Sequence, residues 1–318
     1  MHSRRRFVIG AGMFFVLRPC SFAQGKRRVG ILSLGTPATS QPLVRAFADT
    51  LRERGHADVE IEARFAEGRE NDLARLAGEI AARRPAVFVA PGTVVVEVVR
   101  KAAPGVPIVA LVGDVASAGI SPVLSKPAAG VTGISFQSAS LDAKRLELLA
   151  VLVPKGKAIV NLTDSSARTG AETALGATAR ALGVVLHSVE ARTPEEIDAA
   201  FEAVRKLGAA GVNVLSSPFL NTHRARIMRL AASARLPAIY QWPETAEEGG
   251  LMGYGPRLNA IYRQLAGYTA RILEGARPVD LPIEQPAKLE LVVNLKTARS
   301  LGVALPQSLL VRADRVVD

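Results

Sequence analysis

The stretch VTGISFQS at residues 131–138 divides the sequence into two series of strands and helices. Its first half is rich in β-branched and small residues, which is typical of a buried strand, and Leu141, Leu148 and Leu152 predict a helix over residues 141–153 directly after it. One strand-and-helix series precedes this stretch, and a second one follows it. We therefore expect two lobes with a cleft between them, and we interpret residues 131–138 as a chain crossing between the lobes.

The two series on either side of the crossing share one pattern of buried strands and amphipathic helices. The predicted strands are 29–32, 59–65, 86–90 and 107–112 before the crossing, and 158–162, 184–189, 212–215 and 237–240 after it. Strands that alternate with helices in this way form right-handed βαβ units with parallel strands. The sequence therefore predicts an α/β fold with two Rossmann-like lobes, each built on a parallel sheet.

The pattern changes after Gly249-Gly250, where a short strand and the helix 258–273 follow a completed series. This pair predicts a return to the first lobe, and the segments 281–284 and 289–293 then bring the chain back to the second. The three expected hinge crossings are 131–138, 254–256 and 280–282. The first lobe is expected to contain residues 24–130 and 255–281, and the second lobe residues 131–254 and 282–318.

The N-terminus has the features of a secretory signal peptide. Three arginines at 4–6 precede the apolar run 7–17, and small residues before Gln24 are suited to cleavage. Residues 1–23 are therefore expected to be removed on export to the periplasm, by either the general secretory or the twin-arginine route. A lipid anchor at Cys20, the only cysteine, is not expected, because an arginine and a proline precede it where small residues are needed.

Composition and motifs argue against several functional classes. The net charge falls from +11 to +7 without residues 1–23, which contain four arginines and no acidic residue. The remaining basic residues are scattered among acidic ones, which does not favour binding to nucleic acid. His56, His187 and His223 fall in separate elements without the spacing of metal ligands, and no phosphate-binding loop, dinucleotide fingerprint or nucleophile elbow occurs. We expect no catalytic residue, no metal and no cofactor, and the mature chain has no cysteine for a disulfide.

Several stretches of the chain resemble one family of exported proteins. They are KRLELL (144–149), THRARI (222–227), LPAIY (236–240), GGLMGYGP (249–256), DLPIEQP (280–286) and LVVNLKTA (291–298). Together they resemble the substrate-binding proteins of ABC transporters with the type 1 periplasmic-binding fold, and in particular a branch that includes receptors for amino acids such as tryptophan and tyrosine. The resemblance covers nearly all of the mature chain.

The resemblance implies a monomeric receptor that closes on a small ligand and presents it to an ABC permease in the cytoplasmic membrane. A sensor subunit that docks on a membrane signalling receptor, or an enzyme of the same fold, are the alternatives. Residues 161–164 read Asn-Leu-Thr-Asp where many relatives have Asn-Pro-x-Asn, and residues 34–37 are in a variable loop. The identity of the ligand therefore does not transfer from the family.

The expected ligand-binding residues follow from the predicted strands, because ligands of open parallel sheets bind outside the carboxyl ends of the strands. Two facing lobes place two such edges across one cleft. The residues are Ser33, Thr36, Gly92, Thr93, Gly113 and Asp114 from the first lobe, Asp164, Ser165, Ser166, Ser217, Phe219, Tyr240, Trp242 and Glu244 from the second, and Phe136, Gln137 and Tyr254 on the crossings.

The chemistry of these residues fits a small zwitterion, and an amino acid is the expected ligand, with an aromatic side chain as one option. Helix starts after Thr36, Gly92 and Ser166 offer backbone N–H groups to a carboxylate. Asp114, or alternatively Glu244, can pair with an ammonium group, and the aromatic residues can enclose an apolar side chain. Structural interpretations stand beside these: Ser33 and Asp114 can cap the segments that follow them, and Phe219 and Tyr240 can pack at the rim.

Overall fold

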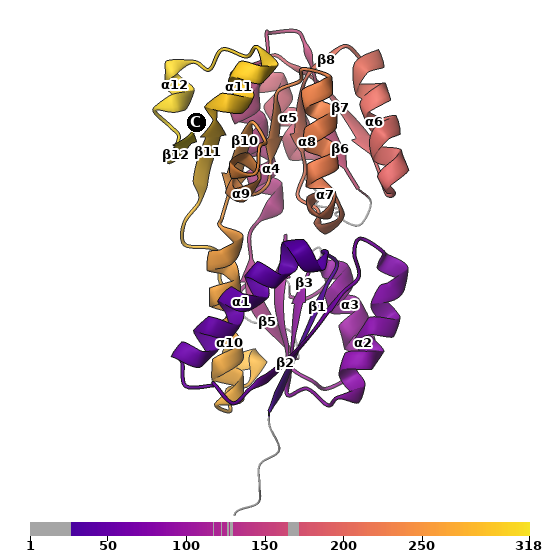
Figure 1. Cartoon of the computed structure of the whole chain (residues 1–318), viewed down its shortest axis with the longest axis vertical. Helices are drawn as coiled ribbons and strands as arrows, with labels where there is room; N and C mark the ends of the chain where they lie inside the picture. Colours follow the sequence, from indigo (N-terminus) through magenta and orange to yellow (C-terminus); the bar gives the residue numbers. More distant parts are fainter. Residues whose placement is uncertain (1–26, 117, 122, 126, 128–129, 165–171) are drawn as a thin grey trace, which may run out of the picture.

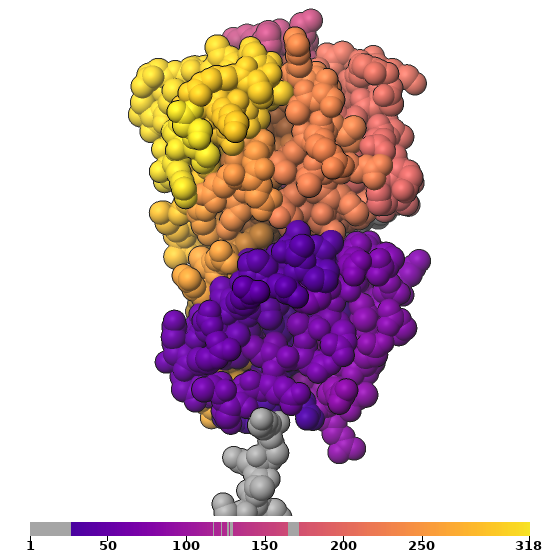
Figure 2. Space-filling model, in the orientation of Figure 1, coloured from indigo at the N-terminus to yellow at the C-terminus, as the bar shows by residue number. Residues whose placement is uncertain are grey.

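The computed structural model describes residues 27–116, 118–121, 123–125, 127, 130–164 and 172–318. Two α/β lobes lie one above the other, with the N-terminal strands in the lower lobe and the C-terminus in the upper one (Figure 1). The space-filling view shows the two lobes in contact along a boundary across the middle of the molecule (Figure 2). The predicted two-lobe α/β architecture is confirmed.

The sheet of the first lobe has five parallel strands in the order β2-β1-β3-β4-β5. They are β1 (Arg28–Ser33), β2 (Glu60–Phe65), β3 (Val87–Pro91), β4 (Ile108–Val112) and β5 (Val131–Ser135). Its helices are α1 (Pro37–Glu53), α2 (Leu73–Ala82), α3 (Thr93–Ala102) and α10 (Leu258–Leu273), with the short 3-10 turns η1 (Glu70–Asp72) and η3 (Pro278–Asp280). Side chains that alternate along β1 reach opposite faces, so Ile31 packs with α1 and α10, whereas Leu32 packs with α2 and α3.

The sheet of the second lobe has seven strands in the order β12-β11-β10-β9-β8-β6-β7. They are β6 (Ala158–Thr163), β7 (Val185–Glu190), β8 (Ala209–Val214), β9 (Ala238–Tyr240), β10 (Met252–Gly255), β11 (Glu290–Asn294) and β12 (Arg315–Val317). Only the β10–β11 pair is antiparallel among the pairings described. The reversal arises because β10 leaves the second lobe and β11 returns to it.

Helices cover both faces of the second sheet. They are α4 (Ser138–Ala150), α5 (Glu172–Leu182), α6 (Pro194–Lys206), α7 (Pro218–Thr222), α8 (Arg224–Ser233), α9 (Pro243–Glu247), α11 (Leu295–Leu301) and α12 (Gln307–Leu310). Residues of α4 and α5 form one apolar cluster with the strands, and residues of α6 and α8 form another on the opposite face. The second cluster continues into the α2 and α3 side of the first lobe, so the apolar cores of the two lobes meet.

The strand that opens the crossing belongs to the first lobe. β5 pairs with β4 along its whole length, from Val131 opposite Ile108 to Ser135 opposite Val112. Gly133 is needed there, because its φ is +136° and a Cβ would lie 2.0 Å from the carbonyl oxygen of Ala110. The expected lobe boundary at residue 131 therefore falls too early, and the chain crosses at residues 136–137, immediately before α4.

The third crossing also lies later than the sequence predicts. Glu284 forms a parallel bridge with Ile134, donating its N–H to the carbonyl of Gly133 and accepting the N–H of Ser135 at 3.0 and 2.9 Å. Residues 281–284 thus remain beside β5 instead of forming a strand of the second lobe, and the chain crosses between Glu284 and β11. The second crossing follows β10 at Gly255, where the sequence predicts it.

Candidate functional site

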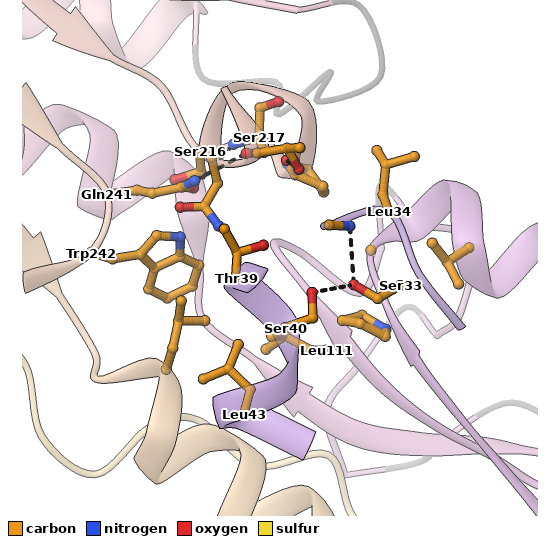
Figure 3. Close-up of a pocket in the computed structure, with 18 of the residues that line it drawn as sticks. Ser33, Leu34, Thr39, Ser40, Leu43, Leu111, Ser216, Ser217, Gln241 and Trp242 are labelled. Atoms are coloured by element: carbon orange, nitrogen blue, oxygen red, sulfur yellow. Dashed lines mark hydrogen bonds between the residues drawn. The ribbon is translucent and has the colours of Figure 1, made fainter. Parts of the chain in front are cut away.

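A cleft of about 550 Å³ lies between the carboxyl edges of the two sheets. Its walls come from the loops after β1, β3 and β4 and the start of α1 in the first lobe, and from the loops after β8 and β9 in the second (Figure 3). Nine predicted residues line it: Ser33, Gly92, Thr93, Gly113, Asp114, Phe136, Ser217, Trp242 and Glu244. The strand-end rule therefore brought these nine residues to the cleft, although they form only part of its wall.

The first-lobe wall is built around the turn between β1 and α1. The hydroxyls of Ser33 and Ser40 are 3.3 Å apart, and the Ser33 hydroxyl accepts the N–H of Gly35 at 3.1 Å (Figure 3). Thr36 does not line the cleft. Its side chain instead accepts the N–H of Thr39, whose hydroxyl accepts the N–H of Thr36, and this capping box begins α1.

The start of α3 differs from the start of α1, because its N-cap residue is a glycine and has no side chain to cap the helix. The N-cap residue is Gly92, with φ +115°, and Gly92, Thr93, Val94 and Val95 all line the cleft. The first N–H groups of a helix have no partner within the helix, and the helix dipole gives them partial positive charge. The start of α3 therefore presents uncapped donors to the cleft.

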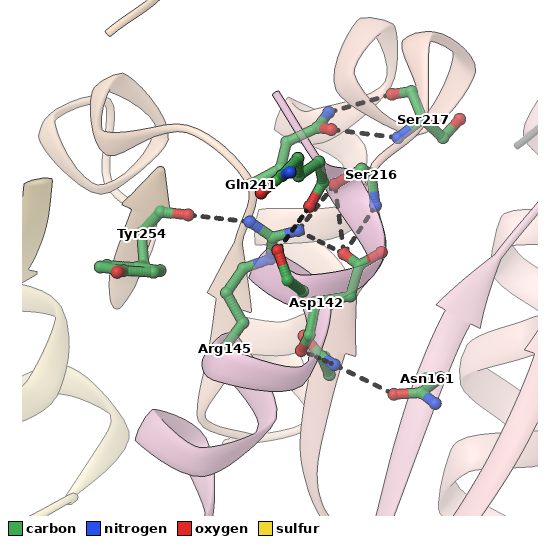
Figure 4. A network of polar contacts seen from close by, with 10 residues as sticks. Asp142, Arg145, Asn161, Ser216, Ser217, Gln241 and Tyr254 are labelled. Carbon is green, nitrogen blue, oxygen red and sulfur yellow. Dashed lines mark hydrogen bonds and ion pairs between the residues drawn. The ribbon is translucent and has the colours of Figure 1, made fainter. Parts of the chain in front are cut away.

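The second-lobe wall is fixed by paired hydrogen bonds between two of its loops. Ser217 donates its N–H to Gln241 Oε1, and Gln241 Nε2 donates to the carbonyl of Ser217, each at 3.0 Å (Figures 3 and 4). The Ser217 hydroxyl donates to Asp164 and accepts the N–H of Leu220. These bonds join the ends of β6, β8 and β9 into one wall.

A buried charge network lies behind this wall, and we call it the hinge network: Asp142, Arg145, Ser216 and the carbonyl of Tyr254 (Figure 4). Arg145 is fully buried and donates to Asp142, to the hydroxyl of Ser216 at 2.6 Å and to the Tyr254 carbonyl at 2.9 Å. Burial raises the pKa of Asp142, while the charge of Arg145 and bonds from Ser216 oppose the shift. The network ties α4, which follows the first crossing, to β10, which precedes the second.

Two aromatic residues meet on the cleft wall near the crossings. The rings of Phe136 and Trp242 have centroids 5.4 Å apart and are tilted by 56°. Trp242 is only 5% exposed, yet its indole Nε1 has no hydrogen-bond partner in the described part of the chain. The same holds for the hydroxyl of Ser138, which also lines the cleft. Buried donors are normally paired, so these two groups are candidates for a bond to a ligand.

Glu244 divides its two carboxylate oxygens between different environments. Its Oε1 accepts the N–H of Leu258, the first residue of α10, at 2.9 Å. Its Oε2 is buried and has no hydrogen-bond partner among the described residues. Burial raises the pKa of Glu244, and the backbone N–H donors and the charge of Arg257 oppose the rise.

The structure places six other predicted residues away from this cleft. Asp164 and Phe219 line a second, smaller hollow of about 440 Å³, which His223 also lines. The ring centroids of Phe219 and His223 are 4.7 Å apart. Tyr240 is in the apolar core, and Tyr254 packs against the core of the second lobe. Gln137 has a left-handed backbone with φ 48° immediately before α4, and Thr36 caps α1. Ser165 and Ser166 lie outside the described residues.

Several cleft residues were not predicted. Ser216 and Gln241 directly follow predicted strands, so the strand-end rule could have included them. Thr39, Leu43 and Tyr262 come from helices, where only their amphipathic spacing was visible in the sequence. That spacing indicates burial but does not distinguish a core from a cleft.

The lobes are also in close contact at the second hollow, which adjoins the cleft because Glu70 lines both. A Cβ at Gly68 of the first lobe would lie 2.9 Å from Nε2 of His223 in the second, and one at Gly92 would lie 3.3 Å from Pro218 Cγ. We call the approach of Gly68 to His223 the mouth contact. Burial lowers the pKa of His223, as does the charge of Arg226.

A family model for ABC transporter substrate binding proteins matches residues 34–317 of this chain. The chain belongs to that family. Substrate-binding proteins of ABC importers are extracytoplasmic binding proteins that take up small molecules for a membrane permease. This agrees with the family resemblance predicted from the sequence. No curated protein matches the sequence.

Solved structures similar to this substrate-binding protein include an ABC domain from Streptococcus pneumoniae in complex with L-Trp. It has a TM-score of 0.83 and 21% identity, over 92% of this chain and 100% of that one. A conserved domain protein from Vibrio cholerae has a TM-score of 0.84 and 22% identity, over 92% and 99% of the two chains. A ligand-free, open structure of CD0873, a substrate binding protein from Clostridium difficile, has a TM-score of 0.63 and 21% identity, over 92% and 99%. These likenesses show the type 1 periplasmic-binding fold.

Two further observations concern the described residues of this substrate-binding protein. No helix among them combines the length and the hydrophobicity that a membrane crossing requires. Within the same residues, no three His, Cys, Asp or Glu side chains form a group that could hold a metal ion.

Proposed function

We propose that the protein is the solute-binding receptor of an ABC importer and that the cleft between its lobes captures one amino acid. The observation that carries the proposal is the cleft itself, whose wall holds three buried polar atoms without hydrogen-bond partners in the described chain: Trp242 Nε1, Ser138 Oγ and Glu244 Oε2. An unpartnered buried polar group costs about 1–3 kcal/mol. A ligand that supplies partners removes this cost, and the volume of about 550 Å³ is typical of small-molecule sites.

The cleft offers complementary groups to the three parts of an amino acid. The uncapped start of α3, with Thr93 in its first turn, supports binding of a carboxylate. The acidic residues Asp114 and Glu244 favour an ammonium group, and the contacting rings of Phe136 and Trp242 favour an apolar or aromatic side chain. The similar structure from Streptococcus pneumoniae was solved with L-Trp, which makes tryptophan the first candidate.

Ligand capture proceeds by hinge closure at the three crossings. A ligand shifts the equilibrium toward the closed form only if it contacts both lobes, and the cleft wall comes from both. The closed form then docks on an ABC permease. We further propose that residues 1–23 direct export to the periplasm and are removed, and that the mature receptor acts as a monomer.

A binding screen tests this function. Mature protein, residues 24–318, is screened with the twenty common L-amino acids by thermal shift, and hits are titrated by calorimetry. We expect one amino acid, with tryptophan first, to bind with a stoichiometry of one and micromolar or tighter affinity. Trp242→Phe keeps an aromatic ring and removes the indole donor, so it should bind about 10-fold more weakly. Absence of binding by every amino acid would contradict the proposal.

A further inference from the structure

The two carboxylate oxygens of Glu244 connect the cleft to the hinge. Glu244 belongs to α9, which packs on β10 and β11 of the second lobe, whereas its Oε1 accepts the N–H of Leu258 at the start of α10. Helix α10 packs along α1 in the first lobe. The bond therefore spans the second crossing and attaches a side chain of one lobe to a helix of the other.

The charge of the cleft favours a cationic group. Besides Glu244, the lining residues include four acids, Glu70, Glu97, Asp114 and Glu248, and a single basic residue, Arg224. Arg224 is already paired with Glu248 through two bonds of 2.5 and 2.8 Å. A ligand that enters this cleft is therefore surrounded by an excess of carboxylates, which attracts positive charge.

Glu244 is half-buried, as Asp114 is, but it differs from the other acids in having a buried oxygen without a partner among the described residues. Its Oε2 is a buried acceptor without a hydrogen-bond partner among the described residues, whereas Asp114 already has an interaction partner. A charge pair is stronger where the surroundings are less polar. An ammonium group at Oε2 supplies the missing hydrogen-bond donor. Its positive charge also favours the ionised form of the Glu244 carboxylate, which is the form that best accepts the N–H at the start of α10.

We propose that Glu244 is the residue that recognises the ammonium group of the ligand and that it links ligand binding to the hinge. This inference rests on the proposed function, because it assigns one group of the amino acid to one residue of the cleft. It also ranks Glu244 above Asp114 as the specificity-determining acid. Ligands without a positively charged amine should then bind weakly, even when their side chain and carboxylate fit the cleft.

The test compares an amino acid with its des-amino analogue. L-tryptophan and indole-3-propionate, or the corresponding pair for whichever amino acid binds tightest, are titrated into wild type, Glu244→Gln and Asp114→Asn, with the exposed-surface variant Glu53→Gln as control. Wild type and Glu53→Gln should prefer the amine by about 10- to 100-fold. Glu244→Gln should bring that ratio close to one, because glutamine keeps an acceptor for Leu258 and removes the charge.

A second measurement tests whether Glu244 is linked to the hinge. Glu244→Ala removes the acceptor for the Leu258 N–H as well as the charge, so its Tm should lie below that of Glu244→Gln, and equal Tm values would contradict the hinge link. A ratio that survives in Glu244→Gln but is lost in Asp114→Asn would overturn the assignment of Glu244 and leave the proposed function intact. Failure of every amino acid to bind wild type would overturn both.

Discussion

The two ends of the inter-lobe cleft are held by different kinds of contact. At the hinge end, Arg145 donates to Asp142, Ser216 and the carbonyl of Tyr254, and Arg257 pairs with Glu247 and Glu290 at 2.9 and 2.7 Å. At the mouth, a glycine of one lobe lies against the ring of His223 in the other.

This difference indicates that the two ends of the cleft have different roles. Charge-assisted bonds at the hinge are directional, so they fix how the crossings are arranged. The mouth contact depends on the absence of a side chain at Gly68, and it contributes mainly close packing. We infer that the hinge bonds determine the relative orientation of the lobes in the closed form. The ligand and the mouth contact determine what fraction of the molecules is closed.

Removal of Arg145 should have the largest effect, because it tests the hinge end directly. Arg145→Ala leaves Asp142 buried without its charge partner, which costs about 3–5 kcal/mol of unfolding free energy in comparable pairs. Urea denaturation measures the loss. Lys144→Ala, next to it on α4, breaks an exposed pair with Glu147 and should cost at most about 1 kcal/mol. Equal losses in the two variants would show that the hinge network is not a stabilising unit.

Gly68→Ala should have a smaller effect, and this variant tests the mouth contact. Its φ is +83° and its new Cβ would lie 2.9 Å from His223 Nε2, so the closed form is disfavoured. Gly55→Ala is a matched control, because Gly55 has φ +87° but nothing within 4 Å of its Cβ position. Both variants should lose similar stability through backbone strain. Only Gly68→Ala should also bind ligand about 10-fold more weakly by calorimetry, and a similar affinity loss in both would argue against the mouth contact.

The smallest expected effect is a pH dependence that arises at the mouth. Burial and Arg226 lower the pKa of His223 in the folded protein, while Glu195 acts against this shift. The hollow that His223 lines also contains charged residues of both signs, namely Glu67, Arg69, Glu70, Asp164 and Arg192. A histidine with a lowered folded-state pKa leaves stability unchanged above its ordinary value near 6.5 and reduces it as the pH falls below that value.

The pH effect is measured as Tm between pH 7.5 and 5.5, for wild type and His223→Gln. We expect the Tm of wild type to decrease more steeply below pH 6.5 than that of the variant. Parallel curves would assign the pH dependence to other groups.

The sequence predicted the elements and the position of the cleft better than it predicted the crossings. Strand ends could be located from apolar runs, which is why Ser33, Gly92, Ser217 and Trp242 were correctly placed at the cleft. The crossing after β5 was placed too early because a strand that pairs at the edge of the first sheet has the same composition as one that begins a second lobe. Only the partner strand β4 distinguishes the two.

Some residues expected in the cleft lie elsewhere because their hydrogen-bonding groups have a structural use. Thr36 follows a strand like Ser33 does, but its hydroxyl is used within the capping box of α1. The hinge network was not predicted, because Asp142 and Arg145 are three residues apart on a helix, a spacing that is also typical of exposed pairs. Their burial depends on Ser216 and Tyr254, which are distant in sequence.

The central claim is that the cleft captures an amino acid, and native mass spectrometry of the mature chain tests it most directly. The protein is purified without added ligand, then incubated with an equimolar mixture of amino acids, and the released small molecule is identified. We predict a single bound amino acid per chain, with a marked decrease in occupancy for Trp242→Phe. A spectrum of wild type that shows only unliganded protein, or a bound molecule without an amino group, would contradict the claim.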